Sequence, residues 1–298
     1  MLARLQRLTT FGLILLAIAV AHWAWRAGRP GLAAAAVLMI AGGHAVVLAL
    51  EFVWMARANR ADPAPAASIG HLLAAWWGEV RAAPTVLCWR QPFRSDRWPD
   101  QLGADARGRR GVGLVHGFVC NRGLWDRWLA KLTGDGVPFV AVNLEPVFGS
   151  IDDYVPIVDA AVARVTQATG RPPVVVAHSM GGLALRRWWA EPGHDDRVHH
   201  AITIGTPHHG TALARLAISP NGRQMQIGSR WLTALRSAEP PQRSRRCTCF
   251  YGHADNIVFP ASNACWPGAD ARHLAATAHV EMADHPAPYA ELRRRLLD

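Results

Sequence analysis

Lysine is nearly absent from this sequence: of 32 basic residues only Lys131 is a lysine, and the rest are arginines. A phosphate-binding P-loop places a glycine directly before its lysine, but Ala130 stands there, which excludes that class of nucleotide-binding protein. A pyridoxal phosphate enzyme is disfavoured as well, because Lys131 would have to form the Schiff base. The zinc motif H-E-x-x-H is also missing despite 14 histidines, so we expect neither a metal nor another cofactor.

Charged residues and cysteines are scarce too. Charged residues make up 18% of the 298 residues against 50% hydrophobic ones, which is typical of a chain with a large buried core. Arginines cluster near 243–246 and 293–295, but no aromatic platform accompanies them, so we expect attraction to anionic lipid and no nucleic-acid partner. The odd number of cysteines fits reduced thiols better than a disulfide framework; they are Cys88, Cys120, Cys247, Cys249 and Cys265.

Two long apolar runs lie near the N-terminus, at 11–25 and 31–56, and a short turn separates them. About 20 helical residues, each rising roughly 1.5 Å, cover the hydrocarbon core of a bilayer, which is about 30 Å thick. The sequence therefore predicts a transmembrane hairpin over residues 1–60, with helices at about 8–25 and 31–56.

A cleaved signal peptide over residues 1–21 is the alternative, because two arginines precede an apolar stretch that ends in small residues. The second apolar run would still leave a membrane protein after cleavage. Inside that run His44 and Glu51 share a helical face. We interpret both as structural, with Glu51 reaching the membrane interface and His44 packing on the partner helix.

Residues 57–67 read as a linker, because alternating proline and alanine cannot continue a helix. Ser68 after it is a good N-cap for an amphipathic helix that docks on the folded domain or, alternatively, on the bilayer surface. The predicted organisation is a hairpin (1–60), a linker and amphipathic helix (61–84) and a folded domain (85–298). The apolar residues of that helix are Leu72, Leu73, Trp76, Trp77 and Val80.

From residue 85 onward, short apolar stretches alternate with helical ones, and this alternation predicts a mostly parallel sheet flanked by helices. The stretch 211–246 interrupts the pattern and predicts an inserted helical cap. The expected strands lie near 85–89, 112–116, 138–143, 173–177, 198–204, 247–251 and 273–278, and the expected helices near 121–132, 152–169, 180–190 and 286–297.

The strand at 173–177 leads through a tight turn containing Ser179 into a helical stretch. Strand, turn and helix in this order are the setting of a nucleophile elbow, which projects a serine hydroxyl clear of the sheet. Ala177 replaces the first glycine of the G-x-S-x-G pattern, whereas Gly181 keeps the second. We take Ser179 as the candidate nucleophile, with His178 and Gly181 shaping the turn.

The strand at 112–116 ends in His116 and Gly117, where a following backbone N–H can point at a developing oxyanion. We assign one donor to the N–H of Phe118. The second is the N–H of Met180, at the positive end of the helix that follows the serine.

An acid and a base follow Ser179 in the chain order Ser, Asp, His. Asp255 comes just after the strand at 247–251, and His279 follows the strand expected at 273–278. His285 is the rival base, although the prolines after it favour a helix-capping use. Other candidates do not fit the order: His116, His208, His209 and Asp284.

These segments resemble the bacterial lipase and esterase branch of the α/β-hydrolase superfamily, and the likeness covers roughly 85–297. The resemblance implies an α/β-hydrolase fold with Ser179 as nucleophile, Asp255 as acid and His279 as base. It also implies an oxyanion hole of the Phe118 and Met180 N–H groups, and a scaffold role for His208 and His209. The segments that carry it are HGFVCNRGLW (116–125), AHSMGGL (177–183), ITIGTPHHGT (202–211), YGHADNIVFP (251–260) and AHVEMA (278–283).

We therefore predict a membrane-anchored serine hydrolase that cleaves carboxylic esters, preferentially lipid esters, through an acyl-enzyme and without a cofactor. The arginines around the apolar runs and the unpaired cysteines place its catalytic domain on the cytoplasmic side of a bacterial inner membrane. An acyltransferase or a thioesterase would use the same triad. A catalytically inactive membrane scaffold is the non-enzymatic alternative.

Overall fold

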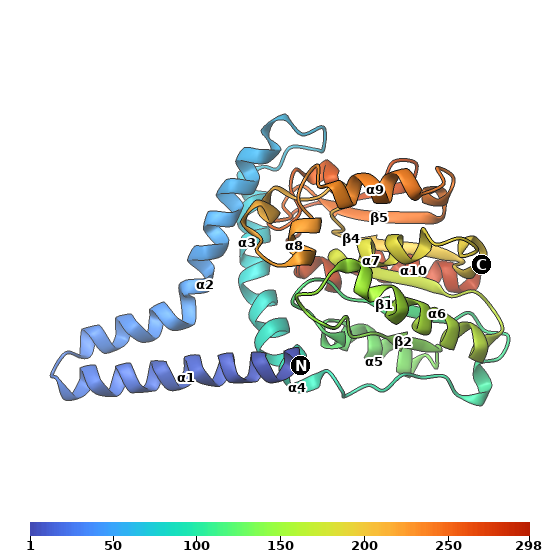
Figure 1. Ribbon diagram of the computed structural model, residues 1–298. Coiled ribbons are helices and arrows are strands. Elements are labelled where there is room, and N and C mark those ends of the chain that lie inside the picture. Colours follow the sequence, from blue (N-terminus) through green and yellow to red (C-terminus); the bar gives the residue numbers. More distant parts are fainter.

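A six-stranded sheet forms the centre of the computed structural model, which describes residues 1–298 (Figure 1). All neighbouring strands are parallel, in the order β2-β1-β3-β4-β5-β6. The predicted parallel sheet with flanking helices is thus confirmed. The strands are β1 (Val112–Val115), β2 (Phe139–Ala141), β3 (Val174–His178), β4 (His200–Ile204), β5 (Cys247–Gly252) and β6 (Asp270–Leu274).

Helices cover both faces of the sheet. Alternate residues of each buried strand point to opposite sides, and both sets are mostly apolar, so both faces must be shielded from water. Val175 and Ala177 of β3 pack with α6 and α7, whereas Val174 and Val176 pack with α5 and α10. Every residue of β3 is buried, as a central parallel strand requires. These helices are α5 (Asp126–Gly134), α6 (Val155–Thr169), α7 (Met180–Trp189) and α10 (Pro286–Leu297).

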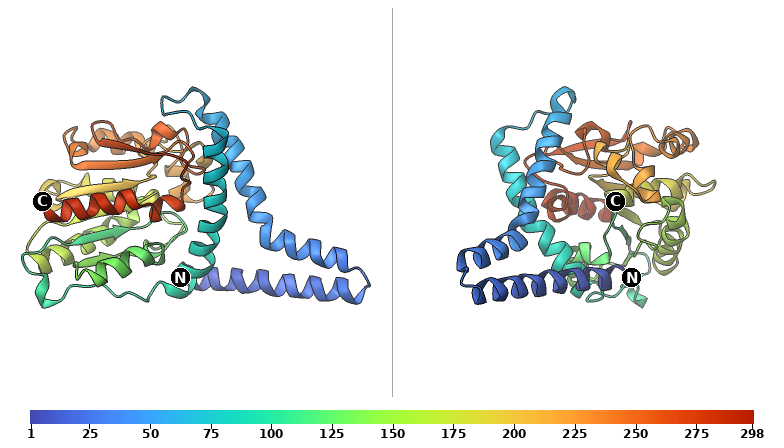
Figure 2. Two further views of the ribbon diagram at one scale, coloured as in Figure 1. Left: turned by 180° about the vertical axis from the view of Figure 1, so that it is seen from behind. Right: turned by 60° about the vertical axis from the view of Figure 1, so that its left-hand side comes forward.

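Two long apolar helices, α1 (Leu2–Arg26) and α2 (Pro30–Ala58), form a hairpin that projects from the sheet-bearing part of the molecule (Figures 1 and 2). Both are long and apolar enough to cross a membrane. Figure 1 shows that α2 bends near its middle and then runs across one end of the sheet. Its central residues include Gly42 and Gly43, and paired small residues are a common cause of such a bend.

The prediction of a strand at 85–89 is wrong. The helix α3 (Ile69–Pro84) continues through a π-helical turn (Thr85–Arg90) into α4 (Gln91–Arg94). Because Pro84 has no N–H, the carbonyl of Val80 is free of its helical partner, and the His44 ring of α2 donates to it at 3.1 Å. The apolar run resembles a strand in composition, but it continues the helix and packs against α1 and the turn at Arg122–Trp125.

The last strand also differs from expectation. β6 ends at Leu274 and not at residue 278, so His279 follows an irregular segment after the strand. The stretch 211–246 contains the short helices α8 (Pro220–Gln224) and α9 (Arg230–Ala238), with a 3-10 turn before and after them.

Candidate active site

Ser179 lies on a sharp turn between β3 and α7, with φ 53° and ψ −130°. A non-glycine residue with positive φ is strained, and such strain persists where the surroundings hold it in place. Here the Ser179 N–H donates to the Ile204 carbonyl of the neighbouring strand at 2.8 Å. The turn therefore holds the serine side chain at the carboxyl edge of the sheet.

Small residues after the serine let α7 lie against the sheet. A Cβ on Gly181 would lie 2.4 Å from the His116 carbonyl oxygen, and one on Gly182 would lie 2.1 Å from Oγ1 of Thr206. Both distances are too short for a side chain. Glycine is therefore required at both positions, because α7 lies close to the His116 backbone and to the Thr206 side chain.

His279 and Asp255 form a buried pair at the same edge of the sheet. The Nδ1–H of His279 donates to Oδ2 of Asp255 at 3.0 Å, and the two residues are 5% and 1% exposed. The other carboxylate oxygen of Asp255 accepts the backbone N–H groups of Ile257 and Val258, at 2.9 and 2.8 Å. When the His279 ring is neutral, the proton on Nδ1 leaves Nε2 unprotonated, so Nε2 can accept a proton.

Electrostatics favour protonation of His279. Burial opposes a charge on the ring, but the charge and hydrogen bond of Asp255, together with Glu79 and Glu51, raise the pKa of His279 above its ordinary value of 6.5. The backbone at Gly205 approaches both members of the pair, because a Cβ there would lie 3.1 Å from His279 Nδ1 and from Asp255 Oδ2. Gly205 itself has φ 55°.

Two further histidines are buried, neutral and structural. The His178 Nε2–H donates to the His279 carbonyl at 3.0 Å, and burial with the adjacent His279 charge lowers the pKa of His178 to about 3. The His116 Nδ1–H donates to the Gly117 carbonyl and its Nε2 accepts the Leu144 N–H, while burial lowers its pKa to about 4. Both rings tie loops at the carboxyl edge together.

The loop after β1 passes directly over Ser179. A Cβ on Gly117 would lie 2.7 Å from the Ser179 Cβ. The Phe118 N–H donates to no other protein atom, and Met180 begins α7, so its N–H has no partner within the helix. Val119, next in the loop, has φ 52°.

A cavity of about 230 Å³ opens beside the serine, with an apolar lining. Phe118 and Ser179 border it on one side, and residues of the 211–246 stretch border it on the other. The Ser179 hydroxyl forms no hydrogen bond with His279 in this structure, as is common in catalytic sites without substrate. The remaining lining includes Leu213, Ala214, Leu216, Met225, Ile257 and Val258.

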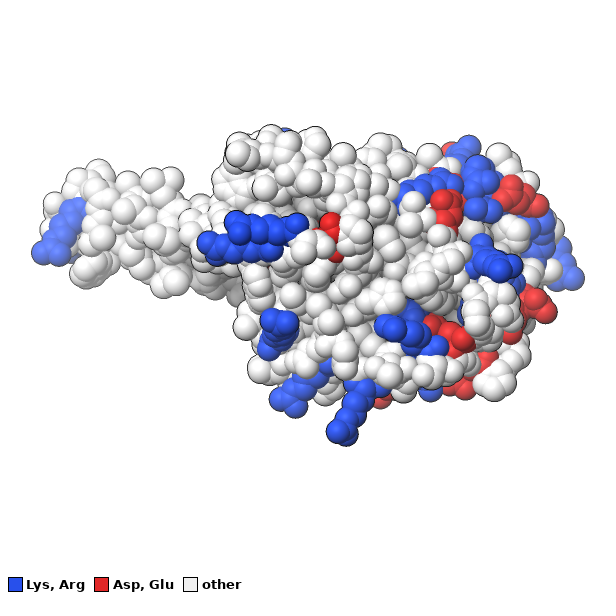
Figure 3. Space-filling model, turned by 90° about the horizontal axis from the view of Figure 1, so that it is seen from above, with Lys and Arg blue, Asp and Glu red and all other residues white.

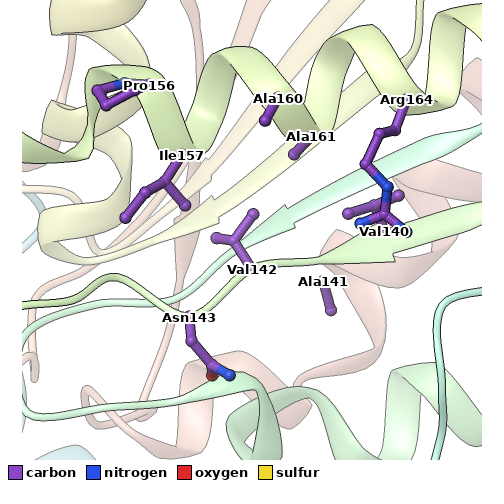
Figure 4. Close-up of a pocket in the computed structure, with 9 residues that line it drawn as sticks. All are labelled: Val140, Ala141, Val142, Asn143, Pro156, Ile157, Ala160, Ala161 and Arg164. Carbon is purple, nitrogen blue, oxygen red and sulfur yellow. The ribbon is translucent and has the colours of Figure 1, made fainter.

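A larger hollow of about 440 Å³ lies elsewhere, between β2 and α6 (Figure 4). Aliphatic side chains dominate it, and Arg164 is its one charged residue. It contains no nucleophile or base, so it is not a candidate for catalysis.

The helices α2 and α3, which precede the sheet in the sequence, contact the segment around His279. The sequence did not predict these contacts. The Glu79 carboxylate on α3 accepts the backbone N–H of Val280 at 3.0 Å. Glu51 on α2 accepts from the Asn256 side chain at 2.8 Å, and Asn256 accepts the His279 N–H at 3.3 Å. Glu51 therefore bonds to the loop beside Asp255, contrary to the interpretation that it reaches the membrane interface.

Three other histidines considered from the sequence have contacts elsewhere. His285 is the N-cap of α10, where its Nδ1 accepts the Ala287 N–H at 3.2 Å. His208 is buried between Thr203 and Arg186, and His209 lies against Arg236. None of them approaches the pair of His279 and Asp255 in the way that His178 does.

Residues 114–297 match the model of the Alpha/beta hydrolase family, which is more than half of the chain. The chain therefore belongs to that family. No curated protein sequence matches it.

Among solved structures, the mature form of the Bacillus licheniformis lipase BlEst2 is similar, with a TM-score of 0.56 and 18% identity over 63% of this chain and 92% of that one. Its propeptide form has a TM-score of 0.55 and 19% identity over 65% of this chain and 51% of that one. Aspergillus fumigatus lipase B has a TM-score of 0.52 and 20% identity over 63% and 52%. At such identities the likeness establishes the shared fold.

Proposed function

We propose that this α/β-hydrolase is a serine hydrolase that cleaves carboxylic esters, with Ser179 as nucleophile, His279 as general base and Asp255 as the acid that orients it. The observation that carries the proposal is the buried hydrogen bond between His279 and Asp255, at the sheet edge where the strained turn holds Ser179. The three residues also follow the chain order of this fold.

In this mechanism His279 Nε2 takes the proton of the Ser179 hydroxyl as its oxygen attacks the ester carbonyl. The Phe118 and Met180 N–H groups stabilise the oxyanion, supported by the positive end of α7. The protonated His279 then gives its proton to the departing alcohol. Water, deprotonated by His279, cleaves the acyl-enzyme and restores Ser179.

The apolar cavity supports an acyl chain as the bound part of the substrate. Its aliphatic lining has no charged side chain to recognise a polar acyl group. Together with the two apolar N-terminal helices, this favours lipid esters, held at a bacterial inner membrane with the catalytic part on the cytoplasmic side. Hydrolysis of short soluble esters with none of long-chain esters would contradict the lipid preference.

Sidedness has its own test. A cysteine introduced in the 57–67 segment, in a variant whose exposed Cys88 is replaced by serine, should resist a membrane-impermeant thiol reagent in intact spheroplasts and react after lysis. Labelling of intact spheroplasts would place the catalytic part outside the cytoplasm.

Ester hydrolysis by the full-length protein in detergent, measured over a series of acyl lengths, tests the catalytic proposal. We expect Ser179→Ala to abolish hydrolysis, while Ser237→Ala, an exposed serine of α9, leaves it unchanged. Product analysis with alcohol and thiol acceptors, and with thioesters, separates an esterase from an acyltransferase or thioesterase. Absence of turnover in the wild type with every acceptor would favour an inactive scaffold.

A further inference from the structure

The part of the hairpin that projects freely is shorter than its helices. The first turns of α1 are held against α4: Gln6 donates to Gln91, and Phe11 packs edge-on against Phe93 with ring centroids 5.7 Å apart. From His44 onward, α2 contacts α3. About 14 residues in each helix therefore project, which is a length of about 21 Å.

A projection of about 21 Å does not reach across a hydrocarbon core of about 30 Å. The tip of the hairpin carries Arg26 and Arg29, which need the polar region of the far leaflet or its edge. The part of the molecule at the base of the hairpin can supply the missing length of about 9 Å. That part is the end of the sheet crossed by α2 and α3 (Figure 2).

The outer face of this helix pair is apolar and exposed. On α3, Ile69, Leu73 and Trp77 recur every four residues with exposed fractions of 77%, 60% and 53%. Acidic side chains lie mostly at the end of the molecule away from the hairpin, whereas basic ones also lie at the tip of the hairpin and where it joins the rest of the molecule (Figure 3). On α2 the exposed apolar residues beyond the bend are Val46, Val47, Leu50 and Val53.

We propose that the outer face of the α2–α3 pair lies within the near leaflet of a lipid bilayer, so that the cavity beside Ser179 receives its ester directly from the membrane. Interfacial amphipathic helices bury their apolar face by about 5–10 Å, which matches the missing length. The second half of the proposal rests on the proposed function. The first half concerns only the position of the helices.

The cavity adjoins the buried side of the same helix pair. Leu213 lines the cavity and packs with the cluster that contains Phe52 and Met55 of α2. Farther along, Leu216 and Ile218 are 71% and 86% exposed. Apolar side chains thus lie between the helix pair and the cavity, and on this proposal a lipid acyl chain enters along them.

Depth measurements on the full chain in vesicles of phosphatidylcholine and phosphatidylglycerol test the position. A nitroxide is attached to Leu73→Cys or, as control, to Leu297→Cys at the opposite end of the molecule, with Cys88 replaced by serine. We expect the label at 73 to collide more with oxygen, which dissolves in lipid, than with a water-soluble nickel complex, and the label at 297 to show the reverse. Equal access of the nickel complex to both labels would overturn the proposal.

Activity tests the route of the substrate. We expect Leu73→Glu with Trp77→Glu to reduce hydrolysis of a long-chain ester in vesicles roughly tenfold, because charged side chains are costly in the bilayer. Turnover of a short soluble ester should stay at the wild-type rate, and Leu297→Glu should alter neither. Unchanged vesicle activity in the double variant would contradict membrane entry. Failure of the wild type on both esters would defeat the proposed function alone, because the depth measurement stands without it.

Discussion

Glu79 of α3 lies directly behind the segment that carries His279, and its carboxylate accepts the backbone N–H groups of Val280 and Glu281 at 3.0 and 3.2 Å. It is 1% exposed, and burial raises its pKa to about 7 against the lowering effect of the bond from Val280. Glu79 lies outside the matched family region of 114–297. A helix that precedes the hydrolase sheet therefore positions the candidate base.

Replacing Glu79 with glutamine should lower kcat and shift the pH profile while leaving KM nearly unchanged. The charged or titratable groups that influence the His279 ring are Asp255, Glu79, Glu51 and His178. The base works only when deprotonated, so in the wild type kcat/KM should rise with pH through a pKa above 6.5. Removing one negative charge lowers the pKa of His279, so this rise should move to lower pH in the variant.

The matched control is Glu191→Gln, a partly exposed carboxylate just after α7. It should change neither kcat nor the pH profile. A Glu79→Gln profile that coincides with the wild-type one would mean that Glu79 acts on stability alone.

The strain at Ser179 predicts that Ser179→Gly is more stable than Ser179→Ala. Both variants lose the hydroxyl and should lose ester hydrolysis. Only glycine adopts φ 53° without a steric cost, and the relief should exceed the entropy that glycine loses on folding, leaving a gain of roughly 1 kcal/mol. Thermal unfolding of the two variants in the same detergent measures the difference, and equal midpoints would argue against strain at this turn.

Replacing Gly181 by a residue with a side chain should create a packing defect. A Cβ there would meet two carbonyl oxygens, of His116 at 2.4 Å and of Val115 at 2.7 Å, and backbone cannot move aside as a flexible side chain can. We expect Gly181→Ala to cost about 1–3 kcal/mol and to impair hydrolysis by shifting Ser179. Gly134→Ala, with nothing within 4 Å, should be neutral in both assays.

The sheet could be predicted from local patterns, because each strand is recognisable from a few consecutive residues. The all-apolar run of β3 and the tight turn at Ser179 are readable from consecutive residues. The acid and base could be chosen by chain order, but their mutual distance could not. His279 was expected at a strand end, yet β6 ends at Leu274, so its position depends on packing and not on the strand.

Contacts between distant segments explain what the sequence did not predict. The run at 85–89 has the composition of a strand, but in the structure it forms a π-helical turn that continues α3 and packs against α1, a contact with a distant segment. Glu79 sits on an amphipathic helix where a single carboxylate is unremarkable, and no local pattern marks it as buried. Glu51 gave a weak signal, as a charge inside an apolar run, but its partner Asn256 is 205 residues away.

A buried ion pair between Arg186 and Glu239 fastens the stretch at 211–246 to α7, beside the candidate active site. Arg186 of α7 binds Glu239, just after α9, through two hydrogen bonds of 2.8 and 2.6 Å, and the side chains are 3% and 5% exposed. Glu239→Ala leaves the Arg186 guanidinium buried without its counter-charge, which should cost about 3–5 kcal/mol.

The contrast with an exposed pair makes this prediction specific. Arg187 of α7 binds Glu191, two residues beyond the end of that helix, with both side chains partly exposed, and Glu191→Ala should cost no more than about 1 kcal/mol. Denaturation midpoints of the two variants in one detergent measure the difference. Since Arg186 also donates to the His208 carbonyl at 2.9 Å, its displacement should loosen the segment between β4 and the cavity, so Glu239→Ala should also slow hydrolysis of long-chain esters. Equal costs for the two alanine variants would mean that water reaches Arg186 and that the pair does not fasten α9 to α7.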